Sequence, residues 1–198
     1  MARQKRGTQQ VRIIGGKFRG RKLHFDGDAS LRPTLGRTRE TLFNWLRGYI
    51  HRCVCLDAFA GSGALGFEAL SQGAASVHFV EHNPRTLRAL QAASQALGVE
   101  SSCTFAAGGA INYLKRARLP VFDVVFLDPP FDQSGLLDDA LSLLASKKLV
   151  RHFVYAEAQH LTLLESVSAN AGFAITKQTQ TGDSAAVLLT PHADIAAC

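Results

Sequence analysis

The stretch Cys53-Val-Cys-Leu-Asp57-Ala-Phe-Ala-Gly61-Ser-Gly63-Ala-Leu-Gly66 decides the fold of this chain. An apolar run ends in a carboxylate, and three glycines follow at the spacing G-x-G-x-x-G. That order predicts a buried strand, a tight turn and a helix packed closely on the strand. Dinucleotides and S-adenosylmethionine (SAM) are both bound by such loops, so the glycines alone do not separate the two ligands.

Two acidic residues refine this prediction. Asp57 suits the cationic methionine part of SAM, because a carboxylate at this point would repel a pyrophosphate. Glu81 follows Gly63 by 18 residues, at the end of the next expected strand, where an acid can accept hydrogen bonds from ribose hydroxyls. Since SAM and NAD both carry such hydroxyls, Glu81 fits either ligand.

Outward from this stretch, apolar runs alternate with helical patterns. Strands are expected over residues 53–59, 76–80, 102–106, 121–127 and 153–156, helices over 37–48, 64–71, 84–97, 110–117, 135–147 and 161–171, and a closing hairpin over 173–177 and 185–190. This alternation predicts an α/β fold with a mostly parallel sheet and helices on both faces. Ligands of such sheets bind beyond the carboxyl ends of the strands, so functional residues should directly follow each run.

The loop Asp128-Pro-Pro-Phe-Asp132 follows the run at 121–127. Its two prolines fix φ and remove two donors, so the strand cannot continue. The Asp128 carboxylate and the Pro129 carbonyl can accept the N–H groups of an exocyclic amine, and Phe131 can stack on a planar base. A proline turn with a core phenylalanine is the plainer alternative, but the glycine loop in the same sheet favours a base-binding site. The predicted catalytic residues are Asp128, Pro129, Pro130 and Phe131.

Positive charge is concentrated at the start of the chain. Residues 1–40 hold eleven Lys or Arg and three acids, whereas the remaining 158 residues sum to −2. Around residues 11–23, apolar and basic residues alternate near glycines, which predicts a small β-hairpin with a basic face. A polyanion such as nucleic acid is the expected partner, and a solvated basic tail is the alternative. The predicted RNA-binding residues are Arg12, Lys17, Arg19, Arg21 and Lys22.

Composition excludes several classes of protein. With 46% hydrophobic and 19% charged residues, the chain can form an ordinary globular core. No apolar run approaches a membrane span, and no signal peptide is visible at Met1. Cys53 and Cys55 are expected to be buried apolar residues, since no second pair stands at metal-ligand spacing. We therefore expect no metal, a cytoplasmic location and a monomer.

The motifs together resemble one family. Asp128-Pro-Pro-Phe is similar to the Asp/Asn-Pro-Pro-aromatic motif of SAM-dependent amino-group methyltransferases, and the stretch from Asp57 to Gly63 resembles their first motif. The segments 12–23, 32–34 and 39–46 look like the RsmD family of bacterial 16S ribosomal RNA methyltransferases. The resemblance implies a Rossmann-like class I methyltransferase fold with a seven-stranded sheet, SAM as cofactor, and the N2 amine of a guanine as target. It also implies that 16S rRNA, the small subunit or its assembly intermediate is the partner.

From these patterns we predict an RNA-binding extension over residues 1–36 and a methyltransferase domain over 37–198. The cofactor residues are expected to be Asp57, Phe59, Ala60, Gly61, Gly63, Glu81, His82 and Ala110. One departure from the family pattern is Gly109, which stands where an Asp or Asn commonly reaches adenine, so adenine would have to rely on backbone groups near Ala110 or on water. The alternatives are an N6-adenine methyltransferase, an NAD-dependent oxidoreductase and a non-enzymatic RNA-binding protein.

Overall fold

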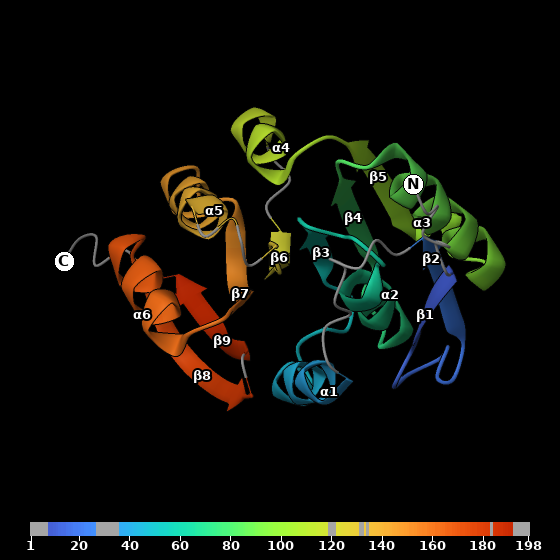
Figure 1. Ribbon diagram of the computed structural model, residues 1–198, viewed down its shortest axis with the longest axis horizontal. Coiled ribbons are helices and arrows are strands. Elements are labelled where there is room, and N and C mark those ends of the chain that lie inside the picture. Colours follow the sequence, from blue (N-terminus) through green and yellow to red (C-terminus); the bar gives the residue numbers. More distant parts are fainter. Residues whose placement is uncertain are drawn as a thin grey trace, which may run out of the picture.

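The computed structural model describes residues 8–26, 36–118, 122–130, 133, 135–182 and 184–191. Within these residues the chain forms one layered α/β body and a small N-terminal hairpin (Figure 1). None of the helices in these ranges combines the length and the apolar character that a membrane span requires.

Seven strands form the central sheet, in the order β5-β4-β3-β6-β7-β9-β8. Their bounds are Val54–Asp57 (β3), Ser76–Glu81 (β4), Cys103–Ala107 (β5), Phe122–Leu127 (β6), Val150–Ala158 (β7), Phe173–Thr181 (β8) and Ser184–Pro191 (β9). The first five strands are parallel, and β9 and β8 close the sheet as an antiparallel hairpin. The chain winds outward from β3 in one direction and from β6 in the other, so the topological switch point lies between these two strands. The seven-stranded sheet with its C-terminal hairpin is therefore confirmed.

Helices cover both faces of this sheet (Figure 1). Their bounds are Gly36–Trp45 (α1), Ala64–Ser71 (α2), Pro84–Leu97 (α3), Ala110–Arg116 (α4), Gly135–Ser146 (α5) and Leu161–Asn170 (α6). One core packs α1, α2 and α3 against one face, and a second core packs α4, α5 and α6 against the other. The central strands are buried on both sides, which explains why they read as continuous apolar runs.

The end of β3 and the start of β7 differ from the expected strand boundaries. β3 ends at Asp57, two residues earlier than expected, because the chain turns there into the glycine loop. β7 begins at Val150 rather than at residue 153, and it includes the exposed Arg151 and His152. The strand reaches this far because Val150 pairs with Phe122 of β6, and Arg151 and His152 lie at an irregularity in the register that a hydrophobic run cannot report.

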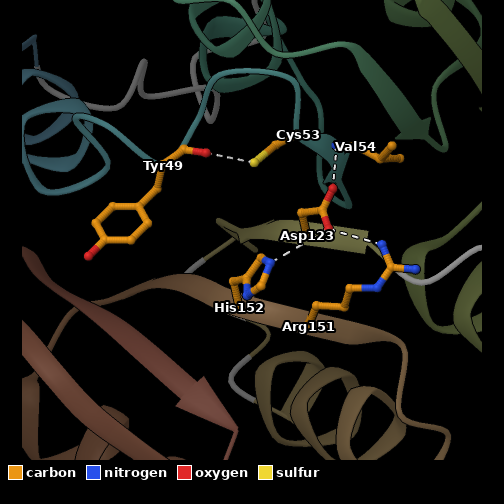
Figure 2. A network of polar contacts seen from close by, with 6 residues as sticks. All are labelled: Tyr49, Cys53, Val54, Asp123, Arg151 and His152. Atoms are coloured by element: carbon orange, nitrogen blue, oxygen red, sulfur yellow. Dashed lines mark hydrogen bonds and ion pairs between the residues drawn. The ribbon is translucent and has the colours of Figure 1, made fainter.

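Polar contacts fasten the amino edge of the sheet, opposite the glycine loop. Asp123 of β6 accepts hydrogen bonds from the backbone N–H of Val54 at 2.8 Å and from Arg151 at 3.1 Å (Figure 2). One carboxylate therefore ties β6 to both of its neighbours, β3 and β7. Nearby, the thiol of Cys53 donates to the carbonyl of Tyr49 at 2.8 Å (Figure 2), and Cys53 and Cys55 are both buried.

The N-terminal hairpin pairs β1 (Thr8–Arg12) with β2 (Lys22–Asp26). Its apolar face, which includes Val11, Leu23 and Phe25, belongs to the same core as α1 and α2. The expected basic hairpin is thus present, with strands that begin three residues before the predicted region and end three residues after it. The predicted domain boundary at residue 36 borders residues outside the described ranges and stays a prediction.

The loop of this hairpin docks on α2. The Glu68 carboxylate, fully buried on α2, accepts the backbone N–H groups of Ile14 at 2.8 Å and Gly15 at 2.7 Å. Gly16 has a φ of +71°, and a Cβ there would lie 1.9 Å from the Ser71 carbonyl oxygen. Only glycine satisfies both the backbone angle and the close approach, so Gly16 seats the hairpin on the helix that follows the glycine loop.

Candidate active site at the carboxyl edge of the sheet

Two loops flank the switch point at the carboxyl edge of the sheet. The glycine loop follows β3, and the loop that contains Asp128 follows β6. The strands are joined in register, with Asp57 opposite Phe126, and the Ala58 N–H donates to the Phe126 carbonyl at 3.1 Å. The topology therefore brings together the two motifs that the sequence separates by about seventy residues, at the position where open α/β sheets bind ligands.

Asp57 fixes the start of α2. Its side chain is 2% exposed and accepts the backbone N–H of Gly66 at 3.0 Å. This N–H belongs to the first helical turn, where no carbonyl of the helix is available to accept it. Asp57 therefore orients the glycine loop, whereas its predicted contact with the cofactor stays a prediction.

The glycines allow the close packing that their spacing indicates. A Cβ on Gly66 would lie 2.3 Å from Cε1 of Phe79, on the neighbouring strand β4. Gly63 has a φ of +73°, and a Cβ there would lie 2.6 Å from Leu90 and 2.7 Å from Phe67. Helix α2 consequently lies against the sheet with no room for a side chain at either glycine.

Glu81 braces the glycine loop from the end of β4. One carboxylate oxygen accepts the Gly61 N–H at 2.9 Å, and the other accepts the Asn83 N–H at 2.7 Å. His82 beside it is 79% exposed, with Nδ1 at 3.2 Å from Glu81. The loop is thus held from two strands, by Asp57 and by Glu81, before any ligand binds. The predicted contact of Glu81 with a ribose stays a prediction.

Open space lies beyond the end of β5. A Cβ on Gly108 or on Gly109 would meet no atom within 4 Å. The Gly108 N–H donates to the Glu81 carbonyl at 3.0 Å, which places this loop beside the end of β4. Ala110, the first residue of α4, is buried directly behind it. Both glycines are exposed, so neither side chains nor backbone of the described residues fill the space in front of them.

The Asp128 loop offers two oxygen acceptors at the end of β6. Asp128 is half-buried, Pro129 is buried and Pro130 is exposed. The Pro130 carbonyl accepts the Gln133 N–H at 3.0 Å. Phe131, predicted to stack on the base, lies outside the described residues.

The carboxyl groups of this edge repel one another. Burial above all, with a contribution from the charges of Asp128 and Glu81 and against the opposing effect of the Gly66 hydrogen bond, raises the pKa of Asp57 to about 7. Asp57 therefore titrates near neutrality. A cationic ligand at this edge would favour its ionised form.

The five predicted RNA-binding side chains are all exposed on the hairpin and its loop. Arg21 donates to the Ala96 carbonyl of α3 at 2.7 Å, and Lys17 lies 5.3 Å from the centre of the Phe18 ring. The structure contains no nucleic acid, so their role stays a prediction. The hydrogen bonds that dock the hairpin loop on α2 hold the segment that carries these cations against the body of the protein.

Sequence reasoning missed three residues beside this site. Glu157 and Tyr155 of β7 and Arg39 of α1 are all buried, at 4%, 0% and 4% exposure. The available signal was the pair Tyr155-x-Glu157 at the end of a strand, since residues two apart share one face. An acid in an apolar strand is rarely fully buried unless it is paired.

The chain is similar to known proteins over most of its length. Residues 11–190 match the family model described as Conserved hypothetical protein 95. Ribosomal RNA small subunit methyltransferase D of Haemophilus influenzae is 44% identical over 154 residues, which cover 76% of this chain and 79% of that protein.

Two solved structures agree with the fold. The Escherichia coli protein yhhF superposes with a TM-score of 0.82 at 35% identity, over 94% of this chain and 100% of that one. Magnesium protoporphyrin IX methyltransferase from Synechocystis PCC 6803, solved with bound SAM, has a TM-score of 0.62 at 19% identity over 78% of each chain, and it shares the fold alone. The family match spans nearly the whole described chain, and we conclude that this protein belongs to the RsmD family that its motifs resemble.

Proposed function

We propose that this protein transfers a methyl group from SAM to the exocyclic N2 amine of a guanine in the 16S RNA of the small ribosomal subunit. One observation carries the proposal: the braced glycine loop and the Asp128-Pro129 acceptors flank the same switch point. A methyl donor and a planar acceptor bound by the two loops would face each other there. The related ribosomal RNA small subunit methyltransferase D supports the substrate class.

The glycine loop fits SAM as its cofactor. The half-buried Gly61 and the buried Gly63 would bring the backbone of the turn close to the cofactor, Glu81 would accept from ribose hydroxyls, and the space at Gly108 and Gly109 would suit adenine. Phe59, Ala60, His82 and Ala110 complete the proposed binding set. When bound, SAM supplies an electrophilic methyl group on a sulfonium, a cation that acidic residues at this edge attract.

On the amine side, Asp128 and the Pro129 carbonyl would accept the two N–H groups of the guanine amine. This pair of acceptors orients the amine and directs its lone pair away from the ring plane, toward the methyl carbon. As the nitrogen forms the new N–C bond it becomes cationic, and the Asp128 carboxylate stabilises that charge and takes the proton released. Pro130 and Phe131 would support and stack the base.

The hairpin would bind the RNA that carries the target base. Its exposed basic residues lie on a surface that is more cationic than the sequence count indicates, because four of the acids beyond residue 40 are buried: Asp57, Glu68, Glu81 and Glu157. Lys and Arg on phosphate release counterions, which gives affinity without sequence preference. Since ribosomal RNA is the proposed substrate, we propose that the protein acts in the cytoplasm. We also propose that it acts as a monomer.

The test is transfer of tritiated methyl from SAM to small ribosomal subunits prepared from a strain that lacks the enzyme. The digested RNA is then analysed by mass spectrometry. We expect N2-methylguanine at one position of 16S RNA. N6-methyladenine would instead identify an adenine methyltransferase, and binding of NAD with no binding of SAM would identify an oxidoreductase. Deproteinised 16S RNA, tested in parallel, determines whether the free RNA or the assembled subunit is the substrate.

A further inference from the structure

Glu68 and Ser71 of α2 hold the backbone of the hairpin loop. The Glu68 carboxylate accepts the N–H groups of Ile14 at 2.8 Å and Gly15 at 2.7 Å. The Ser71 hydroxyl donates to the Gly15 carbonyl at 2.5 Å and accepts the Phe18 N–H at 2.9 Å. The two side chains stand three residues apart on one face of the helix, and both are buried. These bonds are made to backbone atoms of the loop, so they do not engage its basic side chains.

The hairpin loop, residues 13–21, exposes its cations while its backbone is bound. Lys17 and Arg19 are exposed, whereas Phe18 between them is buried. The Lys17 N–H donates to the Ser71 carbonyl at 2.7 Å, so the backbone that carries this cation is itself bound to α2. RNA phosphates that bind these two side chains would therefore be held at a defined position relative to α2.

Helix α2 connects this loop directly to the glycine loop. Every residue of the helix is buried, since the sheet packs on one side of it and the hairpin lies on another (Figure 1). Glu68 lies one turn, about 6 Å along the helix axis, beyond Ala64, the first residue of α2. Since a close-packed helix transmits a displacement rather than absorbing it, the hairpin loop and the glycine loop keep a constant separation.

Other contacts hold the glycine loop and the hairpin strands. Asp57 accepts the Gly66 N–H and Glu81 accepts the Gly61 N–H, so the glycine loop is fixed from β3 and β4. The apolar face of the hairpin strands belongs to the core that also contains α1 and α2. Loss of the Glu68 and Ser71 side-chain contacts should therefore loosen the hairpin loop and leave the cofactor loop and the hairpin strands in place.

Building on the proposed methyl transfer and on the proposed contact of the hairpin with RNA, we propose that Glu68 and Ser71 are positioning residues for the reaction. Through α2 they fix the cations of the hairpin loop, and the RNA bound to them, relative to the glycine loop. The target amine then meets the methyl carbon in one orientation. A misplacement of about 1 Å in such a geometry can cost about 10²-fold in rate. A hairpin that served only as a basic tether would raise affinity alone.

The test separates the rate of transfer from the affinity for the substrate. Enzyme in excess over unmethylated small ribosomal subunits is mixed with SAM, and the single-turnover rate is measured as the enzyme concentration rises. The plateau gives the rate within the complex, and the midpoint gives the affinity. The variants are Ser71→Ala, Glu68→Gln and the double variant. The matched control is Ser94→Ala on α3, because Ser94 is also buried but donates to the Gln91 carbonyl of its own helix at 2.7 Å.

We expect the plateau of the double variant to fall about 10–100-fold and those of the single variants to fall less. The midpoint, and the affinity for SAM in calorimetric titration, should stay close to the wild-type values, because the cations and the glycine loop are retained. An unchanged plateau would overturn the inference and make the hairpin a tether. A parallel loss of SAM affinity would overturn it by making the docking a support of the cofactor loop. A plateau for Ser94→Ala as low as that for Ser71→Ala would overturn it as an effect of general stability.

A second readout is independent of activity. Hydrogen exchange followed by NMR reports the loop amides that α2 accepts, those of Ile14, Gly15, Lys17 and Phe18. We expect them to be protected in wild type and to exchange at least about tenfold faster in the double variant. Equal exchange in the two proteins would show that these side chains do not hold the loop, which overturns the inference. Protected loop amides in a protein that binds SAM but methylates no ribosomal RNA would instead refute the proposed function, and the positioning role with it.

Discussion

Replacing Gly66 by alanine tests how closely α2 must approach the sheet. The added Cβ would lie 2.3 Å from Cε1 of Phe79 and 3.0 Å from Cγ1 of Val77, more than 1 Å inside ordinary contact with the ring. Phe79 cannot move aside, because it is fully buried and packs on Phe105 at 5.4 Å and on Phe67 at 4.8 Å between ring centres.

The change in the free energy of unfolding is the difference between two opposing effects. Overpacking a well-packed core costs about 1–3 kcal/mol, and this displacement belongs at the upper end. Alanine in place of glycine within a helix returns about 0.5–1 kcal/mol. We therefore expect Gly66→Ala to lower the free energy of unfolding by about 2 kcal/mol, and to lower Tm by roughly 4–8 °C for a domain of this size.

Urea unfolding followed by circular dichroism measures this change, and calorimetric titration of SAM measures its effect on the cofactor. Affinity for SAM should also fall, because the shift moves the Gly66 N–H away from Asp57. The matched control is Gly135→Ala at the start of α5, where a Cβ would meet no atom within 4 Å. The reasoning fails if Gly66→Ala is as stable as Gly135→Ala.

Three further predictions concern charge. Asp128→Ala should slow methyl transfer by about 10²–10³-fold in single-turnover assays and leave SAM affinity within about twofold; loss of SAM binding would contradict this role. Because the pKa of Asp57 rises from 3.8 to about 7 on folding, the folded state binds the extra proton. The free energy of unfolding should therefore fall as pH rises from ~4 to ~7 and level off above, and urea titrations of Asp57→Asn should lack this slope, at most about 1.4 kcal/mol per pH unit. The double variant Arg19→Glu, Lys22→Glu should weaken RNA binding uniformly across sequences and flatten its salt dependence in filter assays, with SAM affinity unchanged; an unaltered salt slope would exclude the hairpin from the RNA interface.

Much of the fold could be predicted because its signals are local. Helix α3 is an example: Asn83 accepts the Arg85 N–H at 2.9 Å, Pro84 begins the helix, and Gly98 ends it at a φ of +69°. Each of these residues acts on its immediate neighbours, so short-range patterns are sufficient. The same holds for the glycine loop, whose spacing reports the turn and the helix that follows it.

The contacts of the site residues were less accessible. Glu81 was expected to meet a ribose, but in the structure its oxygens also brace Gly61, twenty residues earlier in the chain. Glu68 was not singled out in the sequence, whereas it is fully buried and holds the hairpin loop more than fifty residues away. No periodicity reports such partners, because each depends on which elements pack together.

By itself, the sequence determined the order of strands and helices, the glycine and Asp128 loops at strand ends, and the concentration of basic residues near the N-terminus. These properties depend on repeats of two and 3.6 residues and on turn chemistry, all of which act within a few residues. Only the tertiary structure decided that Glu157 lies beside Asp128, that Arg39 is buried near Glu157, and that four acids are withdrawn from the surface. These residues are brought close together by strand order and register, and burial then influences the charge of each group.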